Sequence, residues 1–245
     1  MSQDMTIPIL MYHQIDTPPV RGTPMRGMVV SPRRFAAQMR LLRRLGFHGL
    51  SMGELVPYLV GERRGRVVGI TFDDGYLNTL EQALPVLKRH GFTATCYAVS
   101  QRVGCFNDWD AAQGVPQKPL MDAMQLRAWR AAGMEIGAHT RHHMDLPRLP
   151  DDAAREEIHR CRTELEAILD APIEHFCYPY GRYTEREIRL VREAGFLTAT
   201  TVRRGRAQPG NDLYALPRVL VAQATHLGQF ALKLLTAYED RRGRR

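Results

Sequence analysis

The chain has 245 residues, of which 44% are hydrophobic and 24% are charged. This length fits one globular α/β domain with a large core, and the composition excludes a disordered chain. The formal net charge is +8, but the arginines are interleaved with acids, as in Arg155-Glu156-Glu157. That pattern favours solvated helix faces over a nucleic-acid surface, and no nucleic-acid motif occurs, so we expect no nucleic-acid partner.

The sequence also gives expectations about location, cysteine chemistry and domain organisation. No run approaches the roughly 20 apolar residues of a membrane span, and Met1 to Asp16 lacks the features of a signal peptide. We therefore expect a cytoplasmic protein with at most weak peripheral membrane contact. The cysteines show no C-x-x-C spacing, which argues against a structural zinc knuckle. Residues 1–240 are assigned to one domain and residues 241–245 to a basic tail, expected to be disordered. The sequence does not predict the oligomeric state.

The first half of the sequence predicts strands that alternate with helices. Apolar and β-branched runs predict strands over 7–13, 67–70 and 92–99. Helical spacing predicts helices over 32–45, 51–59 and 78–90, the second opened by a capping box, Ser51-x-x-Glu54. From Ser100 to Pro119 the periodicity fails. This long loop either forms one wall of a substrate groove or is simply flexible. Trp109 favours the groove wall, because sugar rings stack on exposed indoles.

The second half continues the alternation. Strands are predicted over 134–138, 174–178, 196–200 and 216–221, and helices over 126–132, 184–194 and 225–238. A further, long helix is predicted after Pro150, with Ile158, Cys161, Leu165 and Ile168 on one face. Asp151 or Asp152 is expected to cap the long helix. The alternation predicts a parallel sheet covered by helices and closed, or nearly closed, into a barrel. In such barrels the chemistry lies on the loops that follow the carboxyl ends of the strands.

Two adjacent acids, Asp73 and Asp74, follow the strand over 67–70 in the segment Thr71-Phe72-Asp73-Asp74-Gly75. A buried strand rarely ends on paired carboxylates for packing reasons, because each charge must be paired, hydrated or bound to a metal. Adjacent residues on an extended chain point to opposite sides. One acid can therefore hold a cation while its neighbour moves a proton. Asp-Asp-Gly is also an ordinary turn, so the rest of the chain decides between the two interpretations.

Other polar residues lie at the expected strand ends, namely His13, His139 with His143, Tyr178 to Gly181, and Arg218. His139 and His143 are four residues apart, so on a helical turn they are close enough to share one ion. Two histidines and one carboxylate, with a position left for water, are the ligands of a catalytic zinc or a similar divalent ion. We expect His142 to be a bystander, although spacing alone does not fix which histidine pairs with His139.

Three motifs occur in an order and at separations that resemble a known family. They are Thr71-Phe72-Asp73-Asp74-Gly75, His139-Thr140-x-x-His143 and Phe176-Cys177-Tyr178-Pro179-Tyr180-Gly181. Together they resemble the first three motifs of the polysaccharide deacetylases, also called carbohydrate esterase family 4 or the NodB homology domain. The resemblance spans roughly residues 7 to 235. Leu10-Met11-Tyr12-His13 and the form of the third motif resemble the branch of bacterial exopolysaccharide (poly-N-acetylglucosamine) deacetylases.

The resemblance implies a deformed (β/α) barrel as a single catalytic domain. It also implies metal-dependent removal of N-acetyl groups from an N-acetylated sugar or polysaccharide precursor. Carried over position by position, Asp73 is the general base, Arg218 pairs with it and keeps it ionised, and the backbone N–H of Tyr180 helps to hold the oxyanion. The implied ligands of one divalent ion, expected to be Zn²⁺, are Asp74, His139 and His143.

Two departures from the family pattern affect these roles. Many members carry an arginine in the third motif where this chain has Cys177, which leaves Arg218 as the candidate for the same electrostatic role. The fifth motif, Leu-x-His, supplies the general acid in many relatives and is not clearly present here. His226 follows Arg218 by only eight residues and has a different preceding residue. The proton donor therefore stays open among His226, His13 and a metal-bound water.

The substrate also stays open. Export would be expected for an enzyme of a cell-wall polymer, whereas a cytoplasmic enzyme would act on a sugar nucleotide, a lipid-linked saccharide or a soluble glycoside. The arginine excess would suit a phosphorylated carrier. The same site would also serve a deformylase of a lipid-linked amino sugar. The missing fifth motif favours a sugar-binding barrel with weak or lost catalysis, which the intact acids and histidines of the first two motifs oppose.

Overall fold

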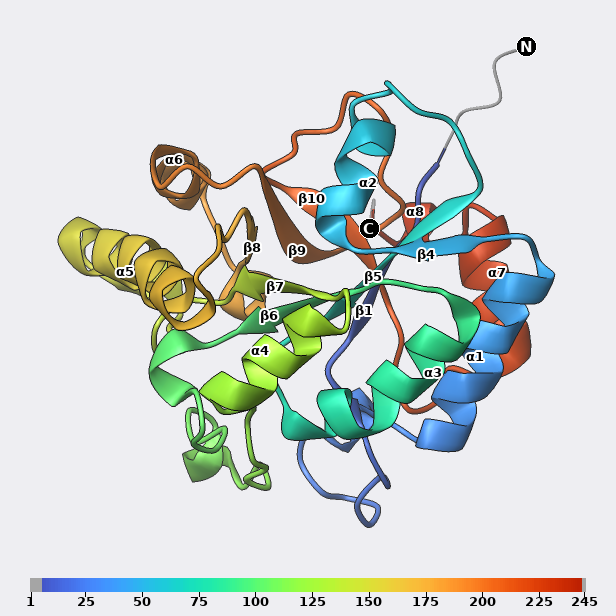
Figure 1. Cartoon of the computed structure of the whole chain (residues 1–245), viewed down its shortest axis with the longest axis horizontal. Coiled ribbons are helices and arrows are strands. Elements are labelled where there is room, and N and C mark those ends of the chain that lie inside the picture. Colours follow the sequence, from blue (N-terminus) through green and yellow to red (C-terminus); the bar gives the residue numbers. More distant parts are fainter. Residues whose placement is uncertain (1–5, 244–245) are drawn as a thin grey trace.

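A computed structural model describes residues 6–243, and in this part of the chain seven parallel strands close a barrel. The strands are β1 (Ile9–Tyr12), β5 (Val67–Phe72), β6 (Thr95–Ala98), β7 (Glu135–Ala138), β8 (His175–Cys177), β9 (Thr198–Arg204) and β10 (Leu216–Leu220). They follow the order β1-β10-β9-β8-β7-β6-β5, and β1 pairs with both β10 and β5, which closes the ring (Figure 1). The predicted (β/α) barrel is therefore confirmed.

The barrel is deformed where β4 (His48–Leu50) joins it. This strand pairs with residues 67–69 of β5, whereas β6 pairs with residues 71–72. Because β1 pairs with β5 over residues 69–72, β4 and β6 share the opposite edge of that strand. A separate parallel pair, β2 (Gln14–Ile15) and β3 (Val29–Val30), follows the carboxyl end of β1.

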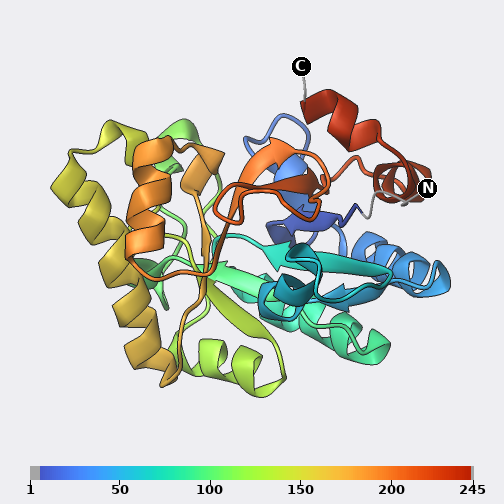
Figure 2. The ribbon, with the colours of Figure 1, turned by 90° about the horizontal axis from the view of Figure 1, so that it is seen from above.

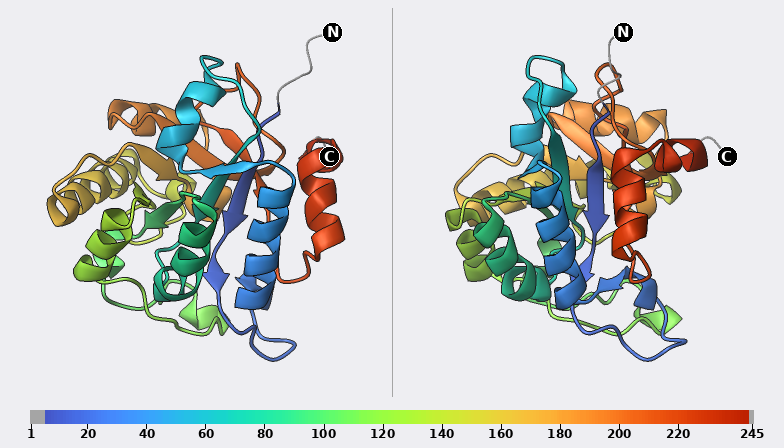
Figure 3. Two further views of the ribbon diagram at one scale, coloured as in Figure 1. Left: turned by 45° about the vertical axis from the view of Figure 1, so that its right-hand side comes forward. Right: turned by 90° about the vertical axis from the view of Figure 1, so that its right-hand side faces the viewer.

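Helices lie on the outside of the strands, as Figures 1 and 2 show. The α-helices are α1 (Pro32–Arg44), α2 (Met52–Leu59), α3 (Leu84–His90), α4 (Ala123–Ala131), α5 (Asp151–Leu169), α6 (Glu185–Glu193), α7 (Leu227–Leu235) and α8 (Tyr238–Gly243). Short helices are η1 (Arg26–Met28), η2 (Thr79–Ala83), η3 (Ser100–Arg102), η4 (Ala111–Gln113), η5 (Leu146–Arg148) and η6 (Pro179–Gly181). Helix α1 packs between α3 and α7, although α7 is distant in sequence (Figure 3).

Alternation along the strands divides the core into two clusters. Leu10, Ile70 and Phe72 belong to a large cluster that also contains residues of the outer helices. The neighbouring positions, such as Ile9 and Val67, face the interior and pack with residues of α2: Met52, Leu55 and Leu59. Because Ile9 and Val67 are the first residues of β1 and β5, α2 closes the amino end of the barrel. The carboxyl end is left for the loops.

Several predicted helix boundaries are corrected by the structure. Ser51 caps α2 as predicted, but the Glu54 carboxylate bonds the Thr93 hydroxyl, so the capping box is not closed. Pro150, not an aspartate, is the N-cap of α5, and Asp151 lies inside its first turn with Asp152. The predicted helix over 78–90 begins instead as the π-helical turn η2 and becomes α-helical only from α3 onward, with Pro85 in its first turn. Proline lacks the N–H that would continue an α-helical ladder.

Two helices, α7 and α8, end the described part of the chain. The helix predicted over 225–238 is interrupted at Thr236, whose backbone is extended, and the chain resumes as α8. The buried Glu239 carboxylate accepts a hydrogen bond from Nε of Arg204 at 2.7 Å and one from Nζ of Lys233 at 2.6 Å. These bonds tie α8 to β9 and α7. Residues 241–243 of the predicted basic tail lie in α8, and residues 244–245 lie outside the described residues. The disorder expected of this tail stays a prediction. Across residues 6–243, no helix has the length and apolar character needed to cross a bilayer.

Candidate active site

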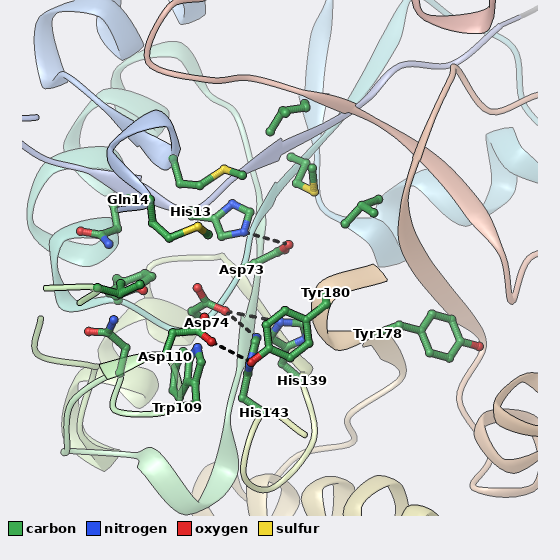
Figure 4. A pocket seen from close by; sticks show the side chains of 18 of the residues that line it. His13, Gln14, Asp73, Asp74, Trp109, Asp110, His139, His143, Tyr178 and Tyr180 are labelled. Atoms are coloured by element: carbon green, nitrogen blue, oxygen red, sulfur yellow. Dashed lines mark hydrogen bonds and ion pairs between the residues drawn. The ribbon is translucent and has the colours of Figure 1, made fainter. Parts of the chain in front are cut away.

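The loops at the carboxyl ends of the strands enclose a cavity of about 390 Å³ (Figure 4). The chain segments before η1 and before α4 lie at this same end of the molecule (Figure 3). Most of the site residues predicted from the sequence line the cavity: His13, Asp73, Asp74, His139, His143 and Tyr180. Arg218, on β10, lies fully buried behind Asp73. The barrel therefore brings together residues that are up to about 200 positions apart in the sequence.

A left-handed turn after β5 places both acids in this cavity. Thr71 and Asp73 share the interior side of the strand, where both accept hydrogen bonds from Arg218. Asp74 has a φ of 76° and Gly75 a φ of 80°, so the extended backbone ends at Asp73. The expectation that the two acids point to opposite sides of an extended chain is therefore wrong, because the turn brings the Asp74 carboxylate into the same cavity.

Asp74 faces two imidazoles. Its Oδ1 atom lies 3.4 Å from Nε2 of His139 and 3.4 Å from Nε2 of His143, and all three side chains are buried. Within the described residues, Asp74 Oδ1 has no hydrogen-bond partner. Such an oxygen is costly to bury unless a cation or water compensates it. Two imidazole nitrogens and one carboxylate oxygen around a single point suit Zn²⁺ or a similar divalent ion.

The orientation of His139 supports this interpretation. Its Nδ1 atom lies 2.7 Å from the carbonyl oxygen of Cys177, and that oxygen can only accept a hydrogen bond. Nδ1 therefore carries the proton when the ring is neutral, and the lone pair of Nε2 faces Asp74. Burial would raise the pKa of Asp74, but the imidazoles of His139 and His143 beside its carboxylate lower it well below its usual range. The carboxylate is therefore anionic, as a metal ligand must be.

The segment between the two histidines is a loop, so the predicted helical turn is wrong. Thr140 and His143 have φ values of 63° and 58°, in the left-handed region. His142 lies outside the group, as expected, because its Nδ1 atom is 2.6 Å from a carboxylate oxygen of Glu157. The structure thus places His143, rather than His142, with His139. The ring of His143 stacks on Trp109 at 4.5 Å and meets Tyr180 edge-on at 4.6 Å.

Asp73 and Arg218 form a buried two-pronged ion pair. Nη1 and Nη2 of Arg218 donate to the two carboxylate oxygens of Asp73, both at 2.7 Å. Nε of Arg218 donates to the carbonyl oxygen of Thr201 at 2.8 Å, and Nη2 lies 3.2 Å from Sγ of Cys177. Burial alone would raise the pKa of Asp73, but the Arg218 guanidinium outweighs it and lowers that pKa. The fork therefore keeps Asp73 ionised in a fixed orientation.

The remaining candidates separate clearly. His13 lines the cavity, and its Nε2 atom lies 3.9 Å from Oδ2 of Asp73. His226 is exposed at the N-cap of α7, where its Nδ1 atom accepts a hydrogen bond from the backbone N–H of Gln229, so it lies outside the cavity.

Tyr180 has a φ of 57° in η6. Sequence reasoning missed Asp110, which also lines the cavity and accepts a hydrogen bond from the Tyr180 hydroxyl. Its only sequence signal is its position beside Trp109.

Comparisons with known proteins agree with this geometry. The family model described as polysaccharide deacetylase matches residues 60–199. The putative polysaccharide deacetylase YxkH of Bacillus subtilis is 28% identical over 218 residues, which cover 88% of this chain and 71% of that protein. A poly-β-1,6-N-acetyl-D-glucosamine N-deacetylase of Staphylococcus aureus is 22% identical over 202 residues, which cover 79% of this chain and 68% of that protein.

A solved structure, that of IcaB from Ammonifex degensii, is also similar. It superposes with a TM-score of 0.80 at 26% identity, covering 94% of this chain and 97% of the other. The family model spans more than half of the chain. Its span contains the Asp73-Asp74 turn, the two cavity histidines and the Tyr180 turn. The chain therefore belongs to the polysaccharide deacetylase family.

Proposed function

We propose that this protein is a metal-dependent hydrolase that removes N-acetyl groups from an N-acetylated sugar, in polymeric or precursor form. The observation that carries the proposal is the grouping of Asp74, His139 and His143 beside the ionised Asp73 in one cavity. The activity in the name of the staphylococcal relative supports an N-acetylglucosamine polymer as the substrate class. The paired acids and histidines oppose the alternative of a barrel that only binds sugars.

In the proposed mechanism Asp74, His139 and His143 hold one divalent ion, which we expect to be Zn²⁺. When bound, such an ion polarises the amide carbonyl and makes water more acidic. Asp73 accepts the proton of the attacking water. Its carboxylate is suited to this role because the Arg218 fork keeps it ionised and stationary. The backbone N–H of Tyr180 donates to the oxyanion that forms as water adds to the carbonyl carbon.

Collapse of the tetrahedral intermediate breaks the C–N bond, and the departing amine must receive a proton. His13 is the protein side chain that we assign to this step. It lines the cavity on the Asp73 side, whereas the other side-chain candidate, His226, is exposed outside it. Asp73 and His13 would thus handle the two protons of the reaction, one taken from water and one given to the amine.

The first test is acetate release from N-acetylglucosamine oligomers. We expect wild-type protein to release acetate when supplied with Zn²⁺ and to stop when a chelator removes the metal. Asp73→Asn should lower kcat by about 10³-fold, because an amide cannot accept the proton, although it fills the same space. Zinc-loaded wild type that releases no acetate from oligomers or from carrier-linked N-acetyl sugars would overturn the proposal.

The second test is zinc binding by calorimetry. His139→Ala should weaken zinc affinity by more than about 100-fold, because loss of a ligand costs more than loss of an outer-shell partner. His142→Ala is a matched control from the same loop and should bind zinc as wild type does, since its ring contacts Glu157 instead. Equal weakening by both substitutions would contradict the assigned ligands.

The third test separates the two side-chain candidates for the proton donor, His13 and His226. His13→Ala should lower kcat by about 100-fold and leave zinc affinity unchanged, because general acid catalysis is lost while the proposed ligands stay. His226→Ala should keep wild-type kcat. If His226→Ala is the slower variant, the assignment of the proton donor to His13 is wrong.

A further inference from the structure

Tyr180 is held in a backbone conformation that bulky residues seldom adopt. Its φ of 57° and ψ of 3° lie in the left-handed region, between Pro179 and Gly181. Such strain persists only where the surroundings over-determine the conformation, and it tends to cluster at functional sites. The Gly181 N–H donates to the carbonyl oxygen of Tyr178 at 2.9 Å, which shapes the turn but does not contact the Tyr180 side chain.

The polar group that holds the Tyr180 side chain comes from a distant part of the sequence. Its hydroxyl donates to Oδ1 of Asp110 at 3.1 Å, a contact between the loop after β8 and the loop after β6 (Figure 4). Burial, and next the Asp110 carboxylate, raise the pKa of Tyr180, so the hydroxyl stays protonated as the donor. Tyr180 as a whole residue is 39% exposed, so packing alone restrains it only in part.

Asp110 is an unusual residue to find at this position. Its exposed fraction is 8%, and within the described residues no cation pairs with it. Besides the Tyr180 hydroxyl, its carboxylate accepts from Nε2 of Gln113 at 3.1 Å. A buried carboxylate without a counter-ion costs stability. The stability of the loop therefore does not account for Asp110.

The neighbouring residue acts on the same side of the cavity. Trp109 stacks on the ring of His143 with an interplanar angle of 20°, and within the described residues Nδ1 of His143 has no hydrogen-bond partner. Unlike His139, His143 is therefore oriented by aromatic contacts from Trp109 and Tyr180. The pair 109–110 touches both His143 and the residue that carries the proposed oxyanion donor.

We propose that Asp110 is a positioning residue. By accepting the hydrogen bond of the Tyr180 hydroxyl, it holds the Tyr180 backbone in the left-handed conformation in which its N–H serves the oxyanion. This inference rests on the proposed function and adds to it a residue outside the three motifs. Because the oxyanion forms only after water adds, loss of this contact should slow turnover more than it weakens substrate binding.

The experiment is a double-mutant cycle on acetate release from N-acetylglucosamine oligomers. Asp110→Ala and Tyr180→Phe should each lower kcat about tenfold, with KM within about twofold of wild type. The double variant should be no slower than either single variant, because both remove the same hydrogen bond. Asp110→Asn should recover most of kcat, since the amide oxygen can accept from the hydroxyl. Tyr180→Phe removes the bond from a partly exposed ring, so the test does not depend on Asp110→Ala folding.

Matched controls distinguish positioning from general loop damage. Gln113→Ala removes the other hydrogen bond to the Asp110 carboxylate and should keep wild-type kcat. Zinc affinity should stay unchanged in every variant. Additive losses in the cycle, an Asp110→Asn variant as slow as Asp110→Ala, or a raised KM at unchanged kcat would each overturn the inference.

A readout without turnover separates this inference from the proposed function. In zinc-loaded protein, the Tyr180 amide NMR signal should be single in wild type and in Gln113→Ala. It should be broadened or shifted in both Asp110→Ala and Tyr180→Phe, because the backbone is released. Unchanged NMR signals in these variants would overturn the positioning role, whether or not wild type is active on N-acetyl sugars. An inactive wild type would instead count against the proposed function alone.

Discussion

The buried pair of Asp73 and Arg218 is the interaction on which the site depends. A charge in the interior of a barrel is costly, and an ion pair offsets that cost only when its geometry is good and its other polar atoms are satisfied. Arg218 meets these conditions with two 2.7 Å bonds to Asp73 and further bonds to Thr201 and Thr71. The pair therefore places a fixed carboxylate anion at the base of a cavity that is otherwise ready to hold a metal.

The left-handed backbone at Asp74 gives the two neighbouring acids different partners. Asp73 ends the extended strand and stays with Arg218, whereas the positive φ of Asp74 turns its carboxylate toward the two histidines. Six described residues other than glycine have positive φ. One of them, Met25, lines the cavity, and four belong to the three sequence motifs: Asp74, Thr140, His143 and Tyr180. Each carries or adjoins a group with a proposed role, so the strain lies where geometry, rather than stability, is at stake.

The barrel and the cavity residues follow from sequence because they rest on local patterns. Alternating strands and helices predict the closed sheet, and polar residues at strand ends predict which side chains meet. The details that failed depend on contacts between distant segments. Nothing in the spacing of His139 and His143 shows that left-handed residues replace a helical turn between them. The hydrogen bond from Tyr180 to Asp110 joins positions 70 residues apart. The Glu54 carboxylate does not complete the predicted capping box, because folding brings the Thr93 hydroxyl within hydrogen-bonding reach of it.

The central claim is that Asp74, and not Asp73, binds the metal with the two histidines. Anomalous diffraction at the zinc absorption edge, from crystals of zinc-loaded protein, tests it most directly. The account predicts one strong peak about 2.0–2.2 Å from an Asp74 carboxylate oxygen and from Nε2 of both His139 and His143, with Asp73 still paired to Arg218. A peak bound instead by Asp73, His139 and Cys177, the other group of potential ligands among residues 6–243, would contradict it.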